Sequence, residues 1–263
     1  MKTANPMIRK MEAGATAIGI GTTLPAGAQV AMLAAKAGFD WAFIDLEHTL
    51  IGPEDVAIIS NMMRAQDIAP VARIPKHALF DVARLLDSGA CGIIRPHVET
   101  AEEARELVEL CKYAPGGDRS WGGASPQLGY PQRPSPELMQ AANRSTLAII
   151  MIESGAGIDA IEEIAAVPGL DGVLIGCVDL SIDLGVMGQV DAPPMHAAIA
   201  RIGRATKAAG KFFGMAGVAA PEALTRIPGI KVDFTLAGLD SRLLAATLED
   251  RATVWRQALG GAG

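Results

Sequence analysis

The chain has 263 residues, half of them hydrophobic, and a formal net charge of −6. It has no basic block, which argues against a nucleic-acid surface, and its longest apolar runs are far shorter than the roughly 20 residues that span a membrane. Three widely spaced cysteines without a CxxC pair, and a start without an apolar leader, favour a reduced, cytoplasmic protein.

Strand and helix patterns alternate along the chain. A short leading helix over residues 5–16 is followed by eight apolar runs, and a helical pattern follows each of them. The predicted strands cover residues 17–22, 39–45, 69–74, 92–98, 147–153, 172–179, 212–217 and 232–239. The predicted helices cover residues 26–38, 53–66, 80–87, 101–111, 136–143, 157–166, 195–209, 221–227 and 241–259.

Eight such units predict an α/β fold, a (β/α)8 TIM barrel that forms a single domain over residues 1–263. A doubly wound open sheet is the alternative, but no GxGxxG follows the first strand. Pairing of the last strand with the first would distinguish the two folds. Residues 113–136 interrupt the alternation with a long connection rich in Gly, Pro and Ser, which is typical of a functional or interface loop.

Several buried strands end in charged residues, and in a parallel barrel these ends meet at one rim. An active site is therefore expected there. The charged residues at this rim are Asp45, Glu47, His48, Arg73, Glu153 and Asp179.

Glu153 and Asp179 end neighbouring strands of the predicted barrel. Two converging carboxylates repel each other and raise one pKa, and a divalent cation resolves that conflict. Oxygen ligands suit Mg²⁺ or Mn²⁺ better than a closed zinc site. The alternative is that either carboxylate caps a following helix, because Ser154 and Ser181 stand beside them.

Asp45 lies three residues before His48, one of only four histidines. The carboxylate could orient the imidazole and raise its pKa, which would make His48 a general base. An ordinary surface histidine is the alternative. Arg73 ends a buried strand, where an unpaired charge is costly. It could bind a substrate carboxylate and stabilise an enolate, or form a salt bridge with Asp45 or Glu47.

Other charged residues receive less weight. Arg95 and His97 stand on the fourth predicted strand with Pro96 between them, and alternation directs only one set of side chains inward. Asp87 is expected at a helix end or an interface. No strand ends in a lysine, which argues against Schiff-base aldolase chemistry.

The motifs taken together resemble the HpcH/HpaI aldolase family in order and spacing, from about Gly19 to the final helix. The motifs are Asp45-x-Glu47-His48, Pro-Val-Ala-Arg at 70–73, Ile-Ile-Arg-Pro-His-Val at 93–98, Ile-Glu-Ser at 152–154 and Gly176-x-x-Asp179-Leu-Ser. The resemblance implies a metal-dependent class II pyruvate aldolase, similar to 4-hydroxy-2-oxoheptanedioate aldolase. Its substrates would be pyruvate or another 2-oxo acid and an aldehyde.

The resemblance also implies residue roles. Glu153 and Asp179 would bind Mg²⁺ or Mn²⁺, with Co²⁺ as a further candidate. Arg73 would hold the keto oxygen, and His48, paired with Asp45, would transfer protons. The substrate carboxylate would bind the backbone amides of the four residues Gly176, Cys177, Val178 and Asp179.

Relatives form trimers or hexamers and exchange the last helix, so a homo-oligomer is expected. The long connection 113–136 would help select the aldehyde, and residues from a neighbouring subunit could contribute with it. Met151 stands where many relatives have Gln, and Cys177-Val178 departs from a common Gly-Pro-x-Asp. The rival functions are a lyase of the citrate lyase β or malyl-CoA lyase kind and a non-catalytic barrel that binds a 2-oxo acid.

Overall fold

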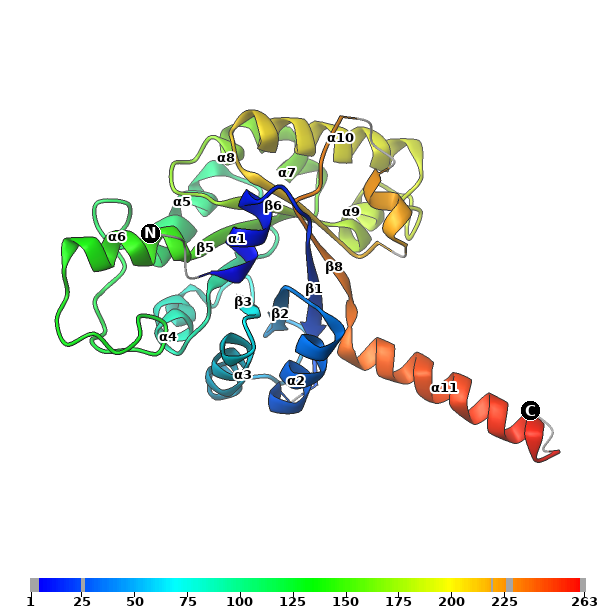
Figure 1. Cartoon of the computed structure of the whole chain (residues 1–263). Coiled ribbons are helices and arrows are strands. Elements are labelled where there is room, and N and C mark those ends of the chain that lie inside the picture. The colour runs from blue at the N-terminus through cyan, green and yellow to red at the C-terminus, as the bar shows by residue number, and fades with distance from the viewer. Residues whose placement is uncertain (1–4, 25–26, 219, 226–228, 261–263) are drawn as a thin grey trace.

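The computed structural model describes residues 5–24, 27–218, 220–225 and 229–260. Eight parallel strands close into a barrel in sequence order (Figure 1). The strands are β1 (Ala17–Thr22), β2 (Trp41–Asp45), β3 (Ala69–Arg73), β4 (Gly92–Arg95), β5 (Leu147–Ile152), β6 (Gly172–Gly176), β7 (Phe212–Ala216) and β8 (Phe234–Leu239). β8 pairs with β1, where Ala17 lies opposite Phe234. The predicted TIM barrel is confirmed, and the open-sheet alternative is wrong.

Helical segments connect the strands. They are α1 (Pro6–Glu12), α2 (Gly27–Ala37), α3 (Pro53–Ala65), η1 (Leu79–Asp81), α4 (Val82–Asp87), α5 (Ala101–Cys111), α6 (Pro136–Ser145), α7 (Gly155–Asp159), α8 (Ile161–Ala165), α9 (Cys177–Asp183), α10 (Pro193–Ala208), η2 (Pro221–Thr225) and α11 (Asp240–Ala258).

Several predicted boundaries need correction. The helix predicted over 157–166 is two short helices, and the helix predicted over 80–87 begins with a 3-10 turn. The end of the helix predicted over 221–227 lies outside the described residues. The strand predicted over 92–98 ends at Arg95, because Pro96 has no N–H for a ladder and His97 adopts a positive φ of 53°. The strand predicted over 172–179 ends at Gly176, and α9 follows without a loop.

Large side chains fill the inside of the barrel. Trp41 and Phe43 of β2 point inward and meet Phe234 of β8, with Trp41 and Phe234 in an edge contact at 5.9 Å. A Cβ at Gly19 would lie 2.2 Å from the Trp41 indole, so only glycine leaves room for the ring. Helix α1 adds Met7, Ile8 and Met11 to this interior cluster. The barrel is therefore a packed core and not a channel.

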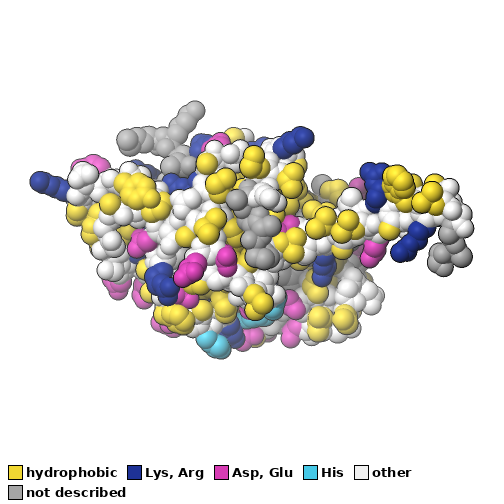
Figure 2. Space-filling model, turned by 90° about the horizontal axis from the view of Figure 1, so that it is seen from below, with side chains coloured by type: hydrophobic (Ala, Val, Ile, Leu, Met, Phe, Trp, Pro, Cys, Tyr) yellow, Lys and Arg dark blue, Asp and Glu magenta, His cyan; other side chains and the backbone are white. Residues whose placement is uncertain are grey.

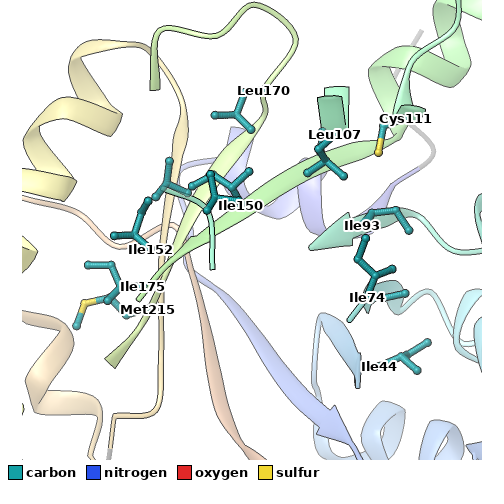
Figure 3. Close-up of a cluster of buried hydrophobic side chains, with 14 of the residues drawn as sticks. Ile44, Ile74, Ile93, Leu107, Cys111, Ile150, Ile152, Leu170, Ile175 and Met215 are labelled. Carbon is teal, nitrogen blue, oxygen red and sulfur yellow. The ribbon is translucent and has the colours of Figure 1, made fainter. Parts of the chain in front are cut away.

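The opposite faces of the strands pack against the helices. Figure 3 shows part of this outer layer, with branched side chains of several strands and, near Ile150, Leu107 of α5. Ile44, Ile93, Ile150 and Ile175 come from β2, β4, β5 and β6, and all four are fully buried. Burial on both faces explains why these strands are apolar along almost their whole length.

The connection between α5 and α6 lies at the amino-terminal end of the barrel. Its Gln127 donates to the carbonyl of Ala90, just before β4, and to the hydroxyl of Thr146, just before β5. Arg119 in the same segment is buried and pairs with Asp87 at 2.6 Å. The segment thus packs at the end of the barrel opposite the rim of charged residues. The expectation that it selects a substrate in its own subunit is wrong.

Helix α11 projects away from the barrel (Figure 1). Its apolar residues Leu244, Leu248, Trp255 and Leu259 are spaced four, seven and four residues apart, and each is about half exposed or more. Such spacing places them on one side of a helix. Figure 2 shows apolar side chains along the protruding helix.

Because α11 projects, it does not cover the outer surface of β8 and β1. A cavity of about 740 Å³ lies there, lined mainly by apolar residues that include Ile18, Leu224, Ile230 and Val232. No helix in the described part of the chain is both long and apolar enough to cross a membrane.

Candidate active site

The strand positions whose side chains point into the barrel end in charged residues at the carboxyl-terminal rim. Alternation along β2 takes the chain from Trp41 through Phe43 to Asp45, and β3 ends in the same way at Arg73. On β5 the inward residue Met151 is followed two positions later by Glu153. The phase that fills the barrel therefore also aims these charges into its mouth.

Arg73 is held by two carboxylates. The register between β2 and β3 places Asp45 directly opposite Arg73. Arg73 Nε and Nη2 donate to the two oxygens of Asp45 at 3.0 and 2.7 Å, and Nη1 lies 3.0 Å from Glu47. The guanidinium also stacks over the Phe43 ring at 4.9 Å. Two of its five N–H donors make hydrogen bonds to described residues, both to Asp45, while Nη1 faces Glu47 as an ion pair, so N–H groups remain for another oxygen.

Asp45 is oriented by this pair and by the turn that follows β2. Its Oδ1 accepts the backbone N–H groups of Glu47 and His48. The predicted pairing of Asp45 with the His48 imidazole is not what the structure has. The imidazole is 64% exposed at the barrel mouth, and its nearest ion-pair partner among the described residues is Glu47, at 3.7 Å.

His97 bridges two carboxylates. Its backbone N–H donates to Glu153 Oε2 at 2.8 Å, and ring Nδ1 lies 3.2 Å from the same oxygen. Ring Nε2 lies 3.4 Å from Glu47 Oε1. A row of contacts therefore joins Asp45, Arg73, Glu47, His97 and Glu153 across β2, β3, β4 and β5.

Glu153 is almost fully buried, at 4% exposure. Burial, and less strongly the charge of Asp179, raise its pKa above the ordinary value, while the contacts with His97 and the charge of Arg73 act in the opposite direction. Its Oε1 lies against Gly176, where an added Cβ would be only 2.5 Å away. The carboxylate thus occupies space that only a glycine at position 176 leaves open.

The junction between β6 and α9 presents backbone amides. Cys177, Val178 and Asp179 form the first turn of α9, where helix N–H groups have no intrahelical partner. Gly217, at the end of β7 with φ 79°, approaches this turn so closely that a Cβ would lie 3.3 Å from the Val178 nitrogen. The Cys177 side chain points away into the core, and burial raises the pKa of its thiol to about 12, so it is no nucleophile.

Glu153 and Asp179 fit the expected divalent cation. Burial is the main cause of the raised pKa of Glu153, the negative charge of Asp179 adds to it, and Asp179 itself is exposed. Among the described residues, no three side chains of the His, Cys, Asp or Glu type converge as a metal-ligand group. An ion held by these two carboxylates would complete its shell with water and substrate oxygens, as Mg²⁺ and Mn²⁺ commonly do.

Sequence reasoning gave too little weight to Glu47 and His97. Glu47 appeared only as a salt-bridge alternative for Arg73, and His97 was grouped with Arg95. The structure separates that pair, because Arg95 points outward to Glu106 on α5 at 2.8 Å. The one available signal for His97 was its residue type, since histidine is enriched among non-glycine residues with positive φ.

Comparison with known proteins decides the family. The sequence profile described as HpcH/HpaI aldolase/citrate lyase matches residues 24–224. The chain belongs to the HpcH/HpaI aldolase/citrate lyase family. It is 35% identical over 257 residues to a 4-hydroxy-4-methyl-2-oxoglutarate aldolase of Chaetomium globosum, with 96% of each chain covered.

Two further family members agree. A hydroxypyruvate/pyruvate aldolase of Roseovarius nubinhibens is 37% identical over 230 residues, covering 84% of this chain and 86% of the relative. The crystal structure of an HpcH/HpaI aldolase from Desulfitobacterium hafniense superposes with a TM-score of 0.88 at 27% identity, covering 95% of this chain and 96% of that one. The predicted family is confirmed, and the protein is a carbon–carbon lyase of the aldolase kind.

Proposed function

We propose that this aldolase depends on a divalent metal and cleaves or forms 4-hydroxy-2-oxo acids, by reversible addition of pyruvate or a related 2-oxo acid to an aldehyde. The observation that carries the proposal is the meeting of three groups at one rim. These are the Arg73 guanidinium, which has N–H groups not used by Asp45, the Glu153 and Asp179 carboxylates, and the amides that begin α9.

Glu153 and Asp179 would hold Mg²⁺ or Mn²⁺, with Co²⁺ as a third candidate. The bound ion would act as a Lewis acid, polarising the keto group of the 2-oxo acid and making the adjacent C–H protons acidic. With such an ion bound, loss of one of these protons would give the enolate, and its carbon would form the new bond to the aldehyde carbonyl carbon in the synthetic direction.

Arg73 binds the substrate oxygen on which negative charge develops. Asp45 and Glu47 hold the guanidinium in place, so it needs no reorganisation when charge appears, and preorganised donors of this kind stabilise enolates. The amides of Cys177, Val178 and Asp179 bind the substrate carboxylate, and Gly217 leaves space above them.

His48 moves the proton between the substrate and solvent. Its imidazole is 64% exposed at the mouth, so it can exchange protons with solvent. Glu47, at 3.7 Å, is its carboxylate neighbour in place of Asp45. Asp45 then contributes by fixing Arg73 and the turn that carries His48.

The named relatives act on 2-oxo acids, including hydroxypyruvate and pyruvate, which supports a small 2-oxo acid as donor. Around the mouth, exposed apolar side chains on the strand-to-helix connections and α9 suit the variable aldehyde. These residues are Leu50, Phe80, Val178 and Met187. Met151 lies below them with almost no exposed surface and offers no hydrogen bond to a substrate.

We also propose a homo-oligomer, a trimer or hexamer, in which α11 is exchanged. The helix has 19 residues, so it is about 28 Å long, and Leu244, Leu248 and Trp255 on its apolar side are about half exposed. The uncovered cavity against β1 and β8 is the matching apolar surface of a second copy. All three cysteines are free and buried, which supports a cytoplasmic location.

The test is deuterium exchange at the pyruvate methyl group in D₂O, followed by proton NMR. Exchange with Mg²⁺ or Mn²⁺ that is abolished by EDTA and by Glu153→Ala, and strongly reduced by Arg73→Ala, is expected. A non-catalytic binding protein would give no exchange above buffer. Saturation by pyruvate and a free aldehyde without a thioester would exclude the citrate lyase β and malyl-CoA lyase alternative.

A further inference from the structure

His97 touches a carboxylate on each side of the site: Glu47, which pairs with Arg73, and Glu153, the expected cation ligand. It lies 3.4 Å from Glu47 through Nε2 and 3.2 Å from Glu153 through Nδ1, with a backbone hydrogen bond of 2.8 Å to Glu153 besides. Nothing in the proposed chemistry uses it.

Both contacts with Glu153 fall on the same oxygen. Oε2 accepts the backbone N–H of His97 and faces its ring, whereas Oε1 lies on the other side, against Gly176. The two oxygens of a carboxylate are otherwise equivalent and exchange by rotation of the terminal side-chain bond. Here the surroundings make them different, because one is held by nitrogen atoms and the other is left without such a contact.

We propose that His97 is a positioning residue that holds Oε2 of Glu153, so that Oε1 alone is presented to the divalent cation. The proposal rests on the proposed metal-dependent function. It assigns to His97 the orientation of a ligand and no contact with the substrate. Groups that orient metal ligands in this way commonly matter for metal affinity nearly as much as the ligands themselves.

The backbone at His97 supports this role. Its φ of 53° lies in the left-handed region, which side chains other than those of Asn, Asp and His rarely adopt. This turn is what directs the N–H toward Glu153 immediately after β4 ends. Strained backbone of this kind persists only where the surroundings hold it, and such positions cluster at functional sites.

Glu47 keeps the imidazole in place from the other side. Its Oε2 lies 3.0 Å from Arg73 Nη1, and its Oε1 faces His97 Nε2. The orientation of the cation ligand on β5 is therefore supported, through His97 and Glu47, by the same guanidinium that would bind the substrate. A substitution of His97 should weaken cation binding directly. It should lower substrate turnover only because less cation is bound.

The experiment is a titration of Mn²⁺ into the full chain, followed by electron paramagnetic resonance of free Mn²⁺. The variants are His97→Gly and His97→Asn, which both tolerate the left-handed backbone and retain its N–H. The glycine variant should bind Mn²⁺ about 10- to 100-fold more weakly than the unmodified protein, the usual cost of losing such a partner. The asparagine variant, which keeps a side-chain N–H donor, should lie between the two.

The matched control is His196→Asn on α10, whose ring lies 3.8 Å from Asp191 and takes no part in the row of contacts from Asp45 to Glu153, and it should bind Mn²⁺ with unchanged affinity. Thermal unfolding identifies any loss of fold. If the glycine variant does not fold, the Mn²⁺ affinity of the asparagine variant tests the proposal. At saturating Mn²⁺, kcat should recover to within a few-fold of the unmodified value. A kcat that stays low would show that His97 takes part in the chemistry and would overturn the positioning role.

Two failures are distinguishable. If the unmodified protein neither binds Mn²⁺ nor exchanges the pyruvate methyl protons, the proposed function fails. If it does both, and His97→Gly binds Mn²⁺ equally well, the inference about His97 fails while the proposed function stands.

Discussion

Gly176→Ala is the smallest change that should disable the cation site. The added methyl group would lie 2.5 Å from Glu153 Oε1 and 2.7 Å from Glu153 Cγ. The first distance is about 0.9 Å short of the 3.4 Å at which ordinary contacts begin. Glu153 cannot retreat easily, because its Oε2 is held by His97 and the residue is buried.

The displacement sets the size of the expected effect. Forcing a methyl group into a packed region costs about 1–3 kcal/mol of unfolding free energy. Moving a reacting or ligating group by about 1 Å can cost on the order of 100-fold in rate. We therefore expect a folded protein whose Mn²⁺ affinity and methyl exchange fall by about two orders of magnitude. Calorimetric titration with Mn²⁺ and exchange NMR measure the two quantities.

Gly155→Ala is the matched control, because it makes the same change two residues after Glu153. A Cβ there would lie 3.5 Å from Asp183, an ordinary contact, so affinity and exchange should be unchanged. If Gly176→Ala binds Mn²⁺ like the unmodified protein, Glu153 Oε1 is not the ligand and the reasoning is refuted.

Three further predictions concern charge and assembly. Asp45→Asn should lower the unfolding free energy by about 3 kcal/mol in urea denaturation, because the buried Arg73 keeps only Glu47 as a charged partner. Glu153→Gln should raise the melting temperature in EDTA at neutral pH, because the raised pKa of Glu153 means that its ionised form opposes folding. The protonated form favours folding, and this effect is lost as pH rises through the raised pKa. The difference in melting temperature between the variant and the unmodified protein should therefore widen with pH above 4.5. Trp255→Glu, on the apolar side of α11, should lower the mass measured by light scattering.

Each of these has an outcome that contradicts it. Asp67→Asn removes an exposed pair with Arg9 and should lower the unfolding free energy by less than about 1 kcal/mol. If Asp45→Asn lowers it by no more than this, the buried pair does not stabilise the fold as argued. If the difference in melting temperature between Glu153→Gln and the unmodified protein narrows as pH rises, the pKa of Glu153 is not raised. A single-chain mass for the unmodified protein would exclude exchange of α11.

The barrel could be predicted because its signals are local. Apolar runs of strand length, each followed by a helical pattern, specify the eight units without reference to distant parts of the chain. The same runs end at Asp45, Arg73 and Glu153, and inward alternation places all three at the mouth. These parts of the site follow from the periodicity of strands.

The contacts within the site could not be predicted in the same way. Asp45 had a partner close in sequence, His48, and a partner 28 residues away, Arg73, and only the register between β2 and β3 brings the second opposite. Past a strand end, alternation no longer gives the direction of a side chain. The placements of Glu47 and His97 therefore depend on turn geometry. At His97 this includes a positive φ, which the sequence does not signal because the residue is not glycine.

The aromatic core and the charged site share the inward-facing positions of the same strands, which limits how this protein could change over evolution. Trp41, Phe43 and Asp45 are successive inward positions of one strand, so a one-residue slip of β2 would turn the aromatic core and the charged group outward together. A shift in the register of β2 therefore cannot move the charged group without also disrupting the core. New specificity is then most accessible through residues that the barrel does not need, such as Leu50, Phe80 and Met187 at the mouth. Directed evolution confined to those positions should yield folded libraries in which only the aldehyde preference varies.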